Sequence, residues 1–561
     1  MMKFDKLTEK KWYPEFLWCY SLFAGTLVAL ALPPKLLPGF EWIALIPFFG
    51  LLLFPMRRIR DLFFFGWLAG IGAFGFYLVW FFDAAPLIWI GIPHMAASIA
   101  FIALGVSLPV MYFALSFGVF LVVIKKLSRS VTQETLFIIL LWPVFEYLRT
   151  WGYSFHPLAQ GTGHIFGDHA GFLLLGYSLA EYDFLRPLAS ILGSYGMSIL
   201  VLIPNTALFL VASGRVFQFK RWVLRVRSTN IAMAAAFLIF VFLIFSGAGY
   251  ILFRIRAVLP ENQDRISIAV VQLNSRPEDS AQDPDAHWEA LRERIQSLLK
   301  KALALSPDIV VMPEGTPTVF NLTPGDSYPT KEDVLGKLGY DKYRLLIDTD
   351  LFATSRIDQK KNTTTLIDNQ KIVRGVYEKR FLMPWGEYMP HFFIWGAQIL
   401  GASSWLDYQL QLKSYIPGTR TGVFQTPLGR VGILTCSEIL SPKLMRDTAR
   451  GGAEIVILSS SDGILRGSSR LHSQNLAMAR IRAVEIRKPI IYASNAGKSF
   501  AVDEKGSIIW ESRASQEEVI NFSVNTNQEE PLAVRIHSLL LLAFGGISLI
   551  GIILPRHSPA A

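Results

Sequence analysis

The stretch Arg430-Val-Gly-Ile-Leu-Thr-Cys436-Ser-Glu438 reads as a short apolar strand that ends at a thiol. In open α/β sheets, catalytic groups and ligands collect where strands end. The chain has one other cysteine, Cys19, inside an apolar run near the N-terminus, so we expect no disulfide and a free Cys436 thiol. A free cysteine is more often a small buried hydrophobe than a nucleophile. The rest of the sequence has to decide between these readings.

Short apolar strands recur on both sides of Cys436 and alternate with helices. The expected strands cover 266–273, 308–312, 344–347, 431–434, 454–458 and 489–492, and the expected helices cover 286–305, 442–451 and 467–487. This alternation is typical of an α/β layered domain. We therefore predict one α/β domain over residues 260–530.

The remainder of the chain is dominated by long apolar runs. They cover about 16–32, 40–54, 62–82, 97–124, 135–151, 192–213, 230–253 and 538–554. A helix needs roughly 20 apolar residues to cross a bilayer, and several runs reach that length. The sequence predicts an α-helical membrane domain of about eight spans, with seven helices in 1–258 and the eighth in 536–556.

Basic residues alternate between the loops. They gather before the first run, after the second, after the fourth and after the sixth, for example at Lys10, Arg57, Lys125 and Arg221. The positive-inside rule places these loops in the cytoplasm, so the α/β domain is expected on the periplasmic side of a bacterial inner membrane. This topology accounts for the net charge of +10, and no nucleic-acid partner is expected.

Two further motifs carry groups that suit acyl transfer. Glu314 follows the strand ending in Met312-Pro313, and Lys379 opens the string Lys379-Arg-Phe-Leu-Met-Pro-Trp385-Gly-Glu387-Tyr. A carboxylate can take the thiol proton, and an ammonium can stabilise an oxyanion. Taken singly, Glu314 could be a capping residue, Lys379 part of a solvated charge run, and Glu387 its surface partner.

The segment 266–520 resembles the carbon–nitrogen hydrolase (nitrilase) superfamily, whose members carry a Glu-Lys-Cys triad on an αββα sandwich. The resemblance implies that Glu314 is the base, that Lys379 stabilises the oxyanion and that Cys436 is the nucleophile. It assigns supporting positions to Glu387, Ser437 and Glu438, with the backbone N–H of Ser437 on the oxyanion. Ser437 stands where the family usually has an aromatic residue.

The membrane half is similar to the apolipoprotein N-acyltransferase family. The similarity rests on Trp142-Pro-Val-Phe-Glu146-Tyr-Leu-Arg149 and on Gly152-Tyr-Ser-Phe-His-Pro157. It implies transfer of an acyl chain from a phospholipid to the diacylglyceryl-cysteine of an apolipoprotein through a Cys436 thioester. We expect a monomer with no cofactor and no metal.

The segment 391–406 is too apolar for an ordinary loop and too interrupted for a span. We interpret it as an interfacial lid, with Trp385, Trp395 and Trp405 facing lipid; core packing under the sandwich is the other reading. Glu146 and Arg149 are expected to form a structural pair at helical spacing. Two other functions stay open: a membrane-tethered amidase or hydrolase, and a transporter or receptor with an inactive nitrilase-like sensor.

Overall fold

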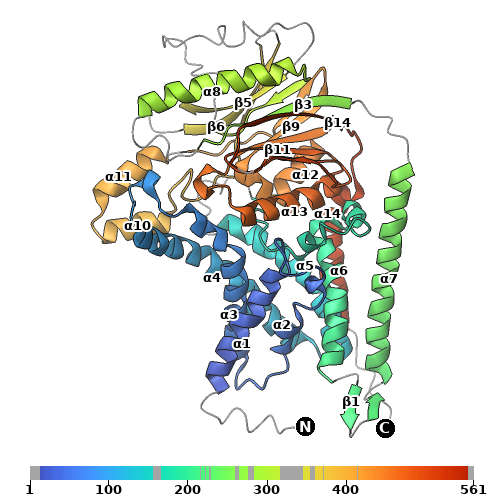
Figure 1. Cartoon of the computed structure of the whole chain (residues 1–561). Helices are drawn as coiled ribbons and strands as arrows, with labels where there is room; N and C mark the ends of the chain where they lie inside the picture. Colours follow the sequence, from blue (N-terminus) through green and yellow to red (C-terminus); the bar gives the residue numbers. More distant parts are fainter. Residues whose placement is uncertain are drawn as a thin grey trace.

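The protein is described here from a computed structural model. It describes residues 13–155, 166–214, 217–220, 223–226, 229–258, 265–275, 284–315, 345–353, 360–369, 372–413, 415–513 and 515–553. Figure 1 shows a layered part that contains the sheets, here called the sheet domain (residues 265–525), standing on a group of long helices, here called the bundle.

Among the described residues, two six-stranded sheets form the sheet domain, in the orders β14-β3-β4-β5-β6-β7 and β13-β12-β11-β10-β9-β8. The first contains β3 (Arg265–Gln272), β4 (Ile309–Val311), β5 (Leu345–Ala353), β6 (Lys360–Asp368), β7 (Val373–Glu378) and β14 (Glu518–Asn525). The second contains β8 (Val423–Thr426), β9 (Gly429–Thr435), β10 (Ile455–Ser461), β11 (Ile490–Asn495), β12 (Phe500–Val502) and β13 (Ile508–Glu511). The strands β3, β4 and β5 run parallel, as do β9, β10 and β11.

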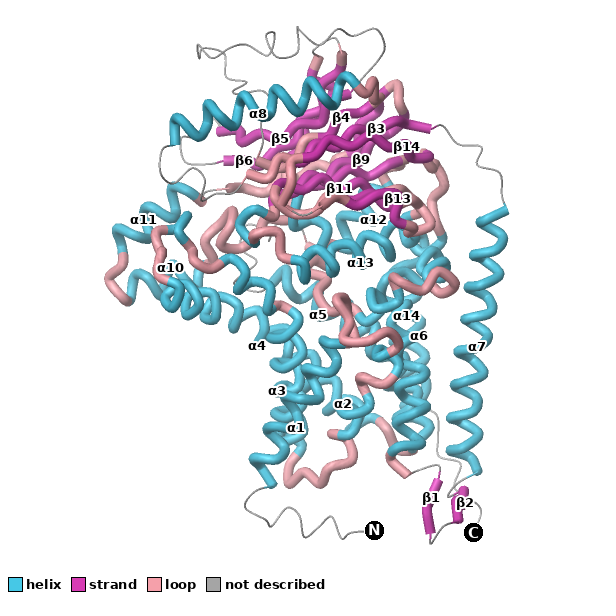
Figure 2. The backbone as a smooth tube through the Cα atoms, viewed as in Figure 1, coloured by secondary structure: helices cyan, strands magenta, loops and turns pink. Residues whose placement is uncertain are grey.

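The two sheets face each other and are covered by helices on their outer sides (Figure 2). Across the interface Ser459 Oγ donates to Met312 O at 2.9 Å, and Thr364 Oγ1 lies 3.1 Å from Thr435 Oγ1. On one outer side α8 (Pro284–Ala304) buries Leu291 and Ile295 against the first sheet. On the other, α12 (Pro442–Arg450) and α13 (Ser469–Ile486) lie between the second sheet and the bundle. This αββα order confirms the predicted α/β fold, including every expected strand and helix.

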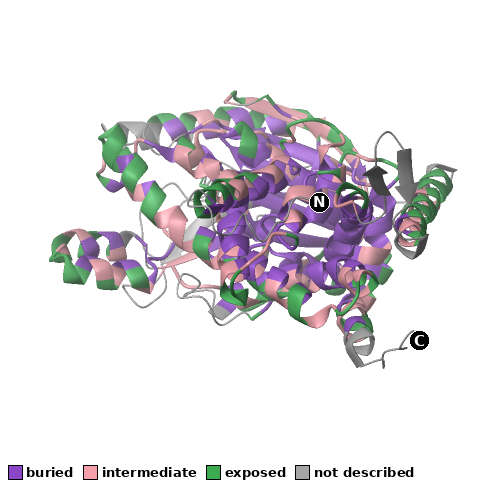
Figure 3. Cartoon of the chain, turned by 90° about the horizontal axis from the view of Figure 1, so that it is seen from below, coloured by how far each residue is buried: buried purple, intermediate pink, exposed green. Residues whose placement is uncertain are grey.

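The bundle consists of long apolar helices. They are α1 (Tyr13–Leu30), α3 (Ile59–Tyr77), α4 (Met95–Leu127), α5 (Val131–Gly152), α6 (Ala189–Ala212), α7 (Thr229–Val258) and α14 (Leu532–Ile553). In the described part of the chain, five helical segments are long and apolar enough to cross a membrane: Ile59–Tyr77, Met95–Leu127, Val131–Gly152, Arg186–Ala212 and Ala232–Ile255. Buried residues fill the centre of the bundle, and α7, at the right of Figure 3, exposes most of its surface.

The second apolar run, 40–54, does not form one long helix. It folds as the short helical turn Phe40–Trp42 followed by α2 (Ile46–Gly50). Asn205 of α6 hydrogen-bonds at the break: its Oδ1 accepts from Leu45 N at 2.9 Å, and its Nδ2 donates to Glu41 O at 2.7 Å. Irregular backbone inside an apolar bundle is tolerated when protein groups satisfy it in this way.

The basic loops gather at the end of the bundle away from the sheet domain. Tyr13 OH at the start of α1 donates to Pro55 O at 3.3 Å, and Lys125 Nζ at the end of α4 donates to Leu52 O at 3.1 Å. The hairpin of β1 (Phe217–Lys220) and β2 (Val223–Val226) lies at the same end in Figure 1.

Glu146 and Arg149 are both buried and their charges interact, as expected, but the direct hydrogen bonds of each side chain go to other groups. Glu146 accepts hydrogen bonds from Trp142 Nε1, Leu175 N and Ser198 Oγ at 2.7–2.9 Å. Arg149 donates to Phe172 O at 2.7 Å. Backbone groups of the loop between α5 and α6 therefore supply partners that helical spacing alone does not reveal.

Candidate active site

Cys436 sits at a sharp turn from strand to helix. It follows Thr435, the last residue of β9, and begins the short helix Cys436–Leu440, here called the nucleophile turn. Its φ of 48° lies in the left-handed region that non-glycine residues rarely adopt. Backbone strain of this kind persists only where the surroundings enforce it, and it is concentrated at functional sites.

Glu438 enforces this turn. It is fully buried and accepts hydrogen bonds from Thr435 N at 2.7 Å and Tyr377 OH at 2.8 Å. It also accepts from the backbone of the neighbouring Lys379 segment, at Arg380 N (2.7 Å) and Phe381 N (3.1 Å). Glu438 thus joins the segment that carries Lys379 to the one that carries Cys436.

Glu314 lies just past the end of β4 and is fixed through both carboxylate oxygens. Asn362 Nδ2 donates to Oε1 at 2.6 Å, and Ser461 N donates to Oε2 at 3.1 Å. Lys379, just past β7, places Nζ 3.8 Å from Glu314 Oε1 and 2.9 Å from Glu387 Oε2. The structure therefore brings Glu314, Lys379 and Glu387 together at the strand ends, as predicted.

Asn362 was not predicted, and it completes this group. Its Nδ2 also donates to Glu387 Oε1 at 2.8 Å, so one amide holds both carboxylates. Glu387 Oε2 further accepts from Met383 N at 2.8 Å. Asn362 lies in β6, whose Asn-Thr-Thr-Thr sequence lacks the apolar pattern used to find strands. The run of β-branched threonines after Asn362 is the sequence signal that could have indicated this strand and its asparagine.

The charges of the group act on the thiol. Burial raises the pKa of Cys436, the Glu314 carboxylate raises it further and the Lys379 ammonium lowers it, with a net upward shift. Burial lowers the pKa of Lys379, but the thiolate form of Cys436 and the carboxylates of Glu387 and Glu314 outweigh this and raise it. The resting site therefore holds a neutral thiol and a charged lysine, so nucleophilic attack needs a base that removes the thiol proton.

Two family models match the chain. Residues 267–532 match the carbon-nitrogen hydrolase model, and residues 24–207 match the apolipoprotein N-acyltransferase N-terminal domain. An apolipoprotein N-acyltransferase of Geobacter metallireducens is 26% identical over 520 residues, covering 91% of this chain and 89% of that protein. Both halves of the chain are thus similar to apolipoprotein N-acyltransferases.

Other relatives and a solved structure extend this picture. An apolipoprotein N-acyltransferase of Borreliella burgdorferi is 22% identical and covers 88% of this chain and 86% of its own length. The crystal structure of Saccharomyces cerevisiae Nit3, a member of the nitrilase superfamily, covers 53% of this chain and 97% of its own at 17% identity, with a TM-score of 0.34. The match to N-acyltransferases thus includes both the bundle and the sheet domain.

Asp462 is a second residue near the site, after Asn362, that the sequence analysis of this chain did not single out. It follows β10 and accepts from Ser494 Oγ at 2.7 Å and from Tyr492 OH at 3.3 Å. Burial raises the pKa of Asp462 to about 6, and Glu314 adds to the rise. Its charge in turn raises the pKa of Cys436. The run Ser459-Ser-Ser-Asp462 at a strand end was the available signal.

Ser437 is buried and points away from solvent. Its Oγ donates to Phe381 O at 2.8 Å, which adds a second link between the nucleophile turn and the Lys379 segment. The position that is usually aromatic in this family therefore has a hydrogen-bonding role in this chain.

The predicted lid forms two helices beside the sandwich, α10 (His391–Ile399) and α11 (Ser403–Leu412), here called the arm. The arm lies against α4 in Figure 1, and does not pack beneath the sheets. The rings of Trp385 and Trp405 lie 5.0 and 6.2 Å from that of Phe101 on α4. Trp395 is 57% exposed, with Ile399 and Leu400 more than 80% exposed. Trp405 thus joins the arm to the bundle, Trp385 packs on the bundle just before the arm begins, and Trp395 faces outward.

Proposed function

We propose that this protein, as a member of the apolipoprotein N-acyltransferase family, transfers an acyl chain from a phospholipid to the α-amine of a lipoprotein's diacylglyceryl-cysteine. The observation that carries the proposal is the Glu314–Lys379–Cys436 site, in a chain whose two halves both match that family. We assign Glu314 as base, Lys379 as oxyanion stabiliser and Cys436 as nucleophile.

The first half-reaction forms a thioester. Glu314 takes the proton from the Cys436 thiol, and the sulfur attacks the ester carbonyl of the phospholipid. Lys379 and the Ser437 backbone N–H stabilise the oxyanion. The C–O bond then breaks, Glu314 returns the proton to the leaving alcohol, and a lysophospholipid departs.

The second half-reaction transfers the acyl chain to nitrogen. The lipoprotein amine attacks the thioester carbon and forms a C–N bond, while Glu314 accepts a proton from the amine. The C–S bond breaks and the proton returns to the Cys436 sulfur, which regenerates the resting site. This alternation of two substrates at one nucleophile is ping-pong chemistry.

We also propose the domain arrangement expected from the sequence: seven spans within 1–258, the catalytic domain over 260–530 on the periplasmic side, and an eighth span within 536–556. The clustering of basic loops at the end away from the sheet domain supports it. Arg57→Cys and Gln516→Cys, each at an exposed position and each combined with Cys19→Ala and Cys436→Ala so that it is the one cysteine, test it in intact cells. A membrane-impermeant maleimide should label the Gln516 position only, and labelling of the Arg57 position instead would reverse the topology.

A labelled phospholipid tests the reaction itself. We expect label on Cys436 as a hydroxylamine-sensitive thioester, absent from Cys436→Ala and retained in Cys19→Ala, which removes the other cysteine. Adding a diacylglyceryl-cysteine peptide should move the label to the peptide amine. Label released at the same rate with and without the peptide would favour the hydrolase, and no label at all would favour the inactive-sensor reading.

A further inference from the structure

A loop of the bundle touches the far end of the nucleophile turn. This loop, residues 167–172, lies between α5 and α6 and is here called the junction loop. Gly171 N donates to Leu440 O at 2.7 Å, and Leu440 ends the short helix that Cys436 begins. His169 Nδ1 lies 2.7 Å from Ser441 Oγ, which also accepts from Leu444 N and caps α12.

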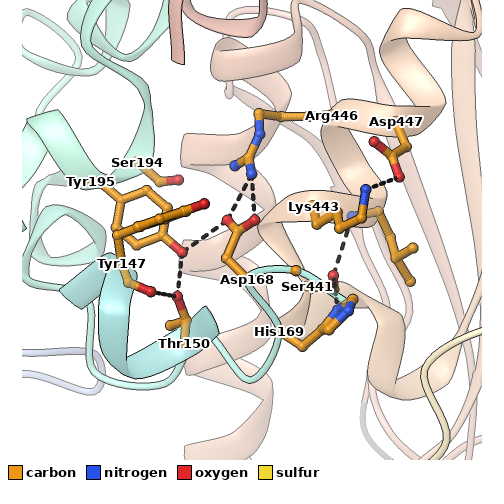
Figure 4. Close-up of polar contacts among 12 residues, drawn as sticks. Tyr147, Thr150, Asp168, His169, Ser194, Tyr195, Ser441, Lys443, Arg446 and Asp447 are labelled. Carbon is orange, nitrogen blue, oxygen red and sulfur yellow. Dashed lines mark hydrogen bonds and ion pairs between the residues drawn. The ribbon is translucent and has the colours of Figure 1, made fainter. Parts of the chain in front are cut away.

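Buried charge holds the junction loop against α12 (Figure 4). Both carboxylate oxygens of Asp168 accept from Arg446 Nη2, at 2.6 and 2.7 Å. On the bundle side, Tyr195 OH donates to Asp168 Oδ2 at 2.9 Å and lies 2.7 Å from Thr150 Oγ1. Hydrogen bonds that involve charged groups are shorter and stronger than neutral ones and are directional. The start of α12 is therefore held in one orientation relative to the bundle.

His169 also touches the other catalytic segment. Its ring stacks on that of Phe381, with centroids 5.1 Å apart and planes at 13°. Phe381 N donates to Glu438, and Phe381 O accepts from Ser437 Oγ. One imidazole of the bundle thus contacts both the Lys379 segment and the end of the nucleophile turn.

We propose that His169 is a positioning residue for acyl transfer: the bundle, through the junction loop, sets the place of the Cys436 sulfur relative to Lys379. The inference rests on the acyl-transfer function proposed above. A shift of about 1 Å in a reacting group costs on the order of 100-fold in rate, so a contact this close to the nucleophile turn matters. The bundle is then a working part of the active site as well as its membrane anchor.

Two substitutions separate the contacts of His169. His169→Phe keeps a ring against Phe381 and removes the bond to Ser441, whereas His169→Asn keeps a polar atom near the Nδ1 position and removes the ring. Trp80→Phe is the matched control, because it keeps a ring and removes one buried hydrogen bond across the same boundary, from Trp80 Nε1 to Gln474 Oε1 at 3.0 Å. All are made in the full-length Cys19→Ala protein, so that Cys436 is its one thiol.

Two readouts apply: the kcat and KM of acyl transfer from a fluorescent phospholipid to a lipopeptide, and the rate of Cys436 alkylation by iodoacetamide against pH. For His169→Phe we expect kcat to fall about tenfold, with KM for the donor within about twofold, since a misplaced nucleophile affects the chemical step. The pH midpoint of alkylation should shift because the distance from sulfur to Lys379 changes. Trp80→Phe should leave both readouts at parental values.

The proposal is overturned if folded His169→Phe and His169→Asn, matched to the parent in thermal midpoint, reproduce the kcat and the alkylation profile of Trp80→Phe. Failure of the proposed function looks different. In that case the parent transfers no acyl chain, while the His169 substitutions still move the alkylation profile and so support positioning.

Discussion

Two of the contacts between the bundle and the sheet domain are built differently. At the arm, rings of Trp385 and Trp405 pack on Phe101, and neighbouring apolar side chains stay exposed. At the junction loop, Asp168 and Arg446 form a buried ion pair among directional hydrogen bonds. Apolar packing is non-directional and tolerates sliding, whereas charged hydrogen bonds fix one geometry. The molecule therefore combines a non-directional apolar contact at the arm with a directional, charged contact at the junction loop.

Removal of the Asp168 carboxylate should break the charged contact and give the largest effect. Asp168→Ala leaves Arg446 buried beside Glu485, 3.9 Å away, without its main partner. Loss of one member of a buried pair costs about 3–5 kcal/mol. Thermal unfolding of the full-length protein in detergent measures this. Glu530→Ala, which removes the partner of the exposed Arg535, is the control at less than about 1 kcal/mol, and equal losses would contradict the comparison.

Acid should weaken the same contact. Burial raises the pKa of Asp168, but the Arg446 charge outweighs this and the net pKa is lowered. The stability contributed by a carboxylate with a lowered pKa is present above its unfolded pKa of about 4 and is lost as the pH falls through the folded value. The thermal midpoint of the parent should therefore drop below about pH 4 by more than that of Asp168→Asn. If the thermal midpoints of the two proteins fall in parallel as the pH is lowered, the Asp168 carboxylate does not contribute in this way.

Changes in the arm should affect lipid use more than stability. Trp395→Ser with Trp405→Ser should raise the KM for phospholipid about tenfold, because the Trp395 ring no longer enters the lipid interface and the arm loses the contact of Trp405 with Phe101. The thermal midpoint should change little for Trp395→Ser alone, since the ring is 57% exposed. Steady-state kinetics in mixed micelles measure the first effect. Unchanged lipid turnover would rule out the lid role.

The smallest effect is expected at a neutral contact between the two halves. Trp80→Phe removes one hydrogen bond to Gln474 and should cost about 1 kcal/mol of stability. The kcat should not change, because Trp80 does not touch the nucleophile turn in the contacts of the described chain. A loss of kcat as large as that of His169→Phe would mean that any contact between the halves governs the site.

The sequence predicted the parts of the site that follow apolar strands. Glu314 and Cys436 each follow a buried strand, so the apolar pattern indicated them. Lys379 lies in a string of residues that resembles the corresponding motif of the nitrilase superfamily, so the resemblance indicated it. Asn362 escaped because β6 is polar, although its amide holds both carboxylates.

The junction loop escaped for a different reason. Asp168 and Arg446 lie 278 positions apart, and no periodicity links them. The hydrogen-bond partners of Glu146 and Arg149 were missed for the same reason, since they include loop backbone groups that helical spacing does not reveal. Local patterns predict elements and strand ends, while contacts between distant loops require the folded chain.

The break at residues 40–50 has a consequence for how the protein is made. Its backbone groups at Glu41 and Leu45 are satisfied by Asn205, 160 positions after Leu45. Chains emerge from the ribosome N-terminus first, at about 5–20 residues per second. At that rate the early segment waits about 8–32 s for its amide partner, in a setting where unsatisfied backbone is costly. The segment 40–50 can therefore reach its final hydrogen-bonded form only after α6 has been synthesised, because the side chain of Asn205 on α6 supplies the partner.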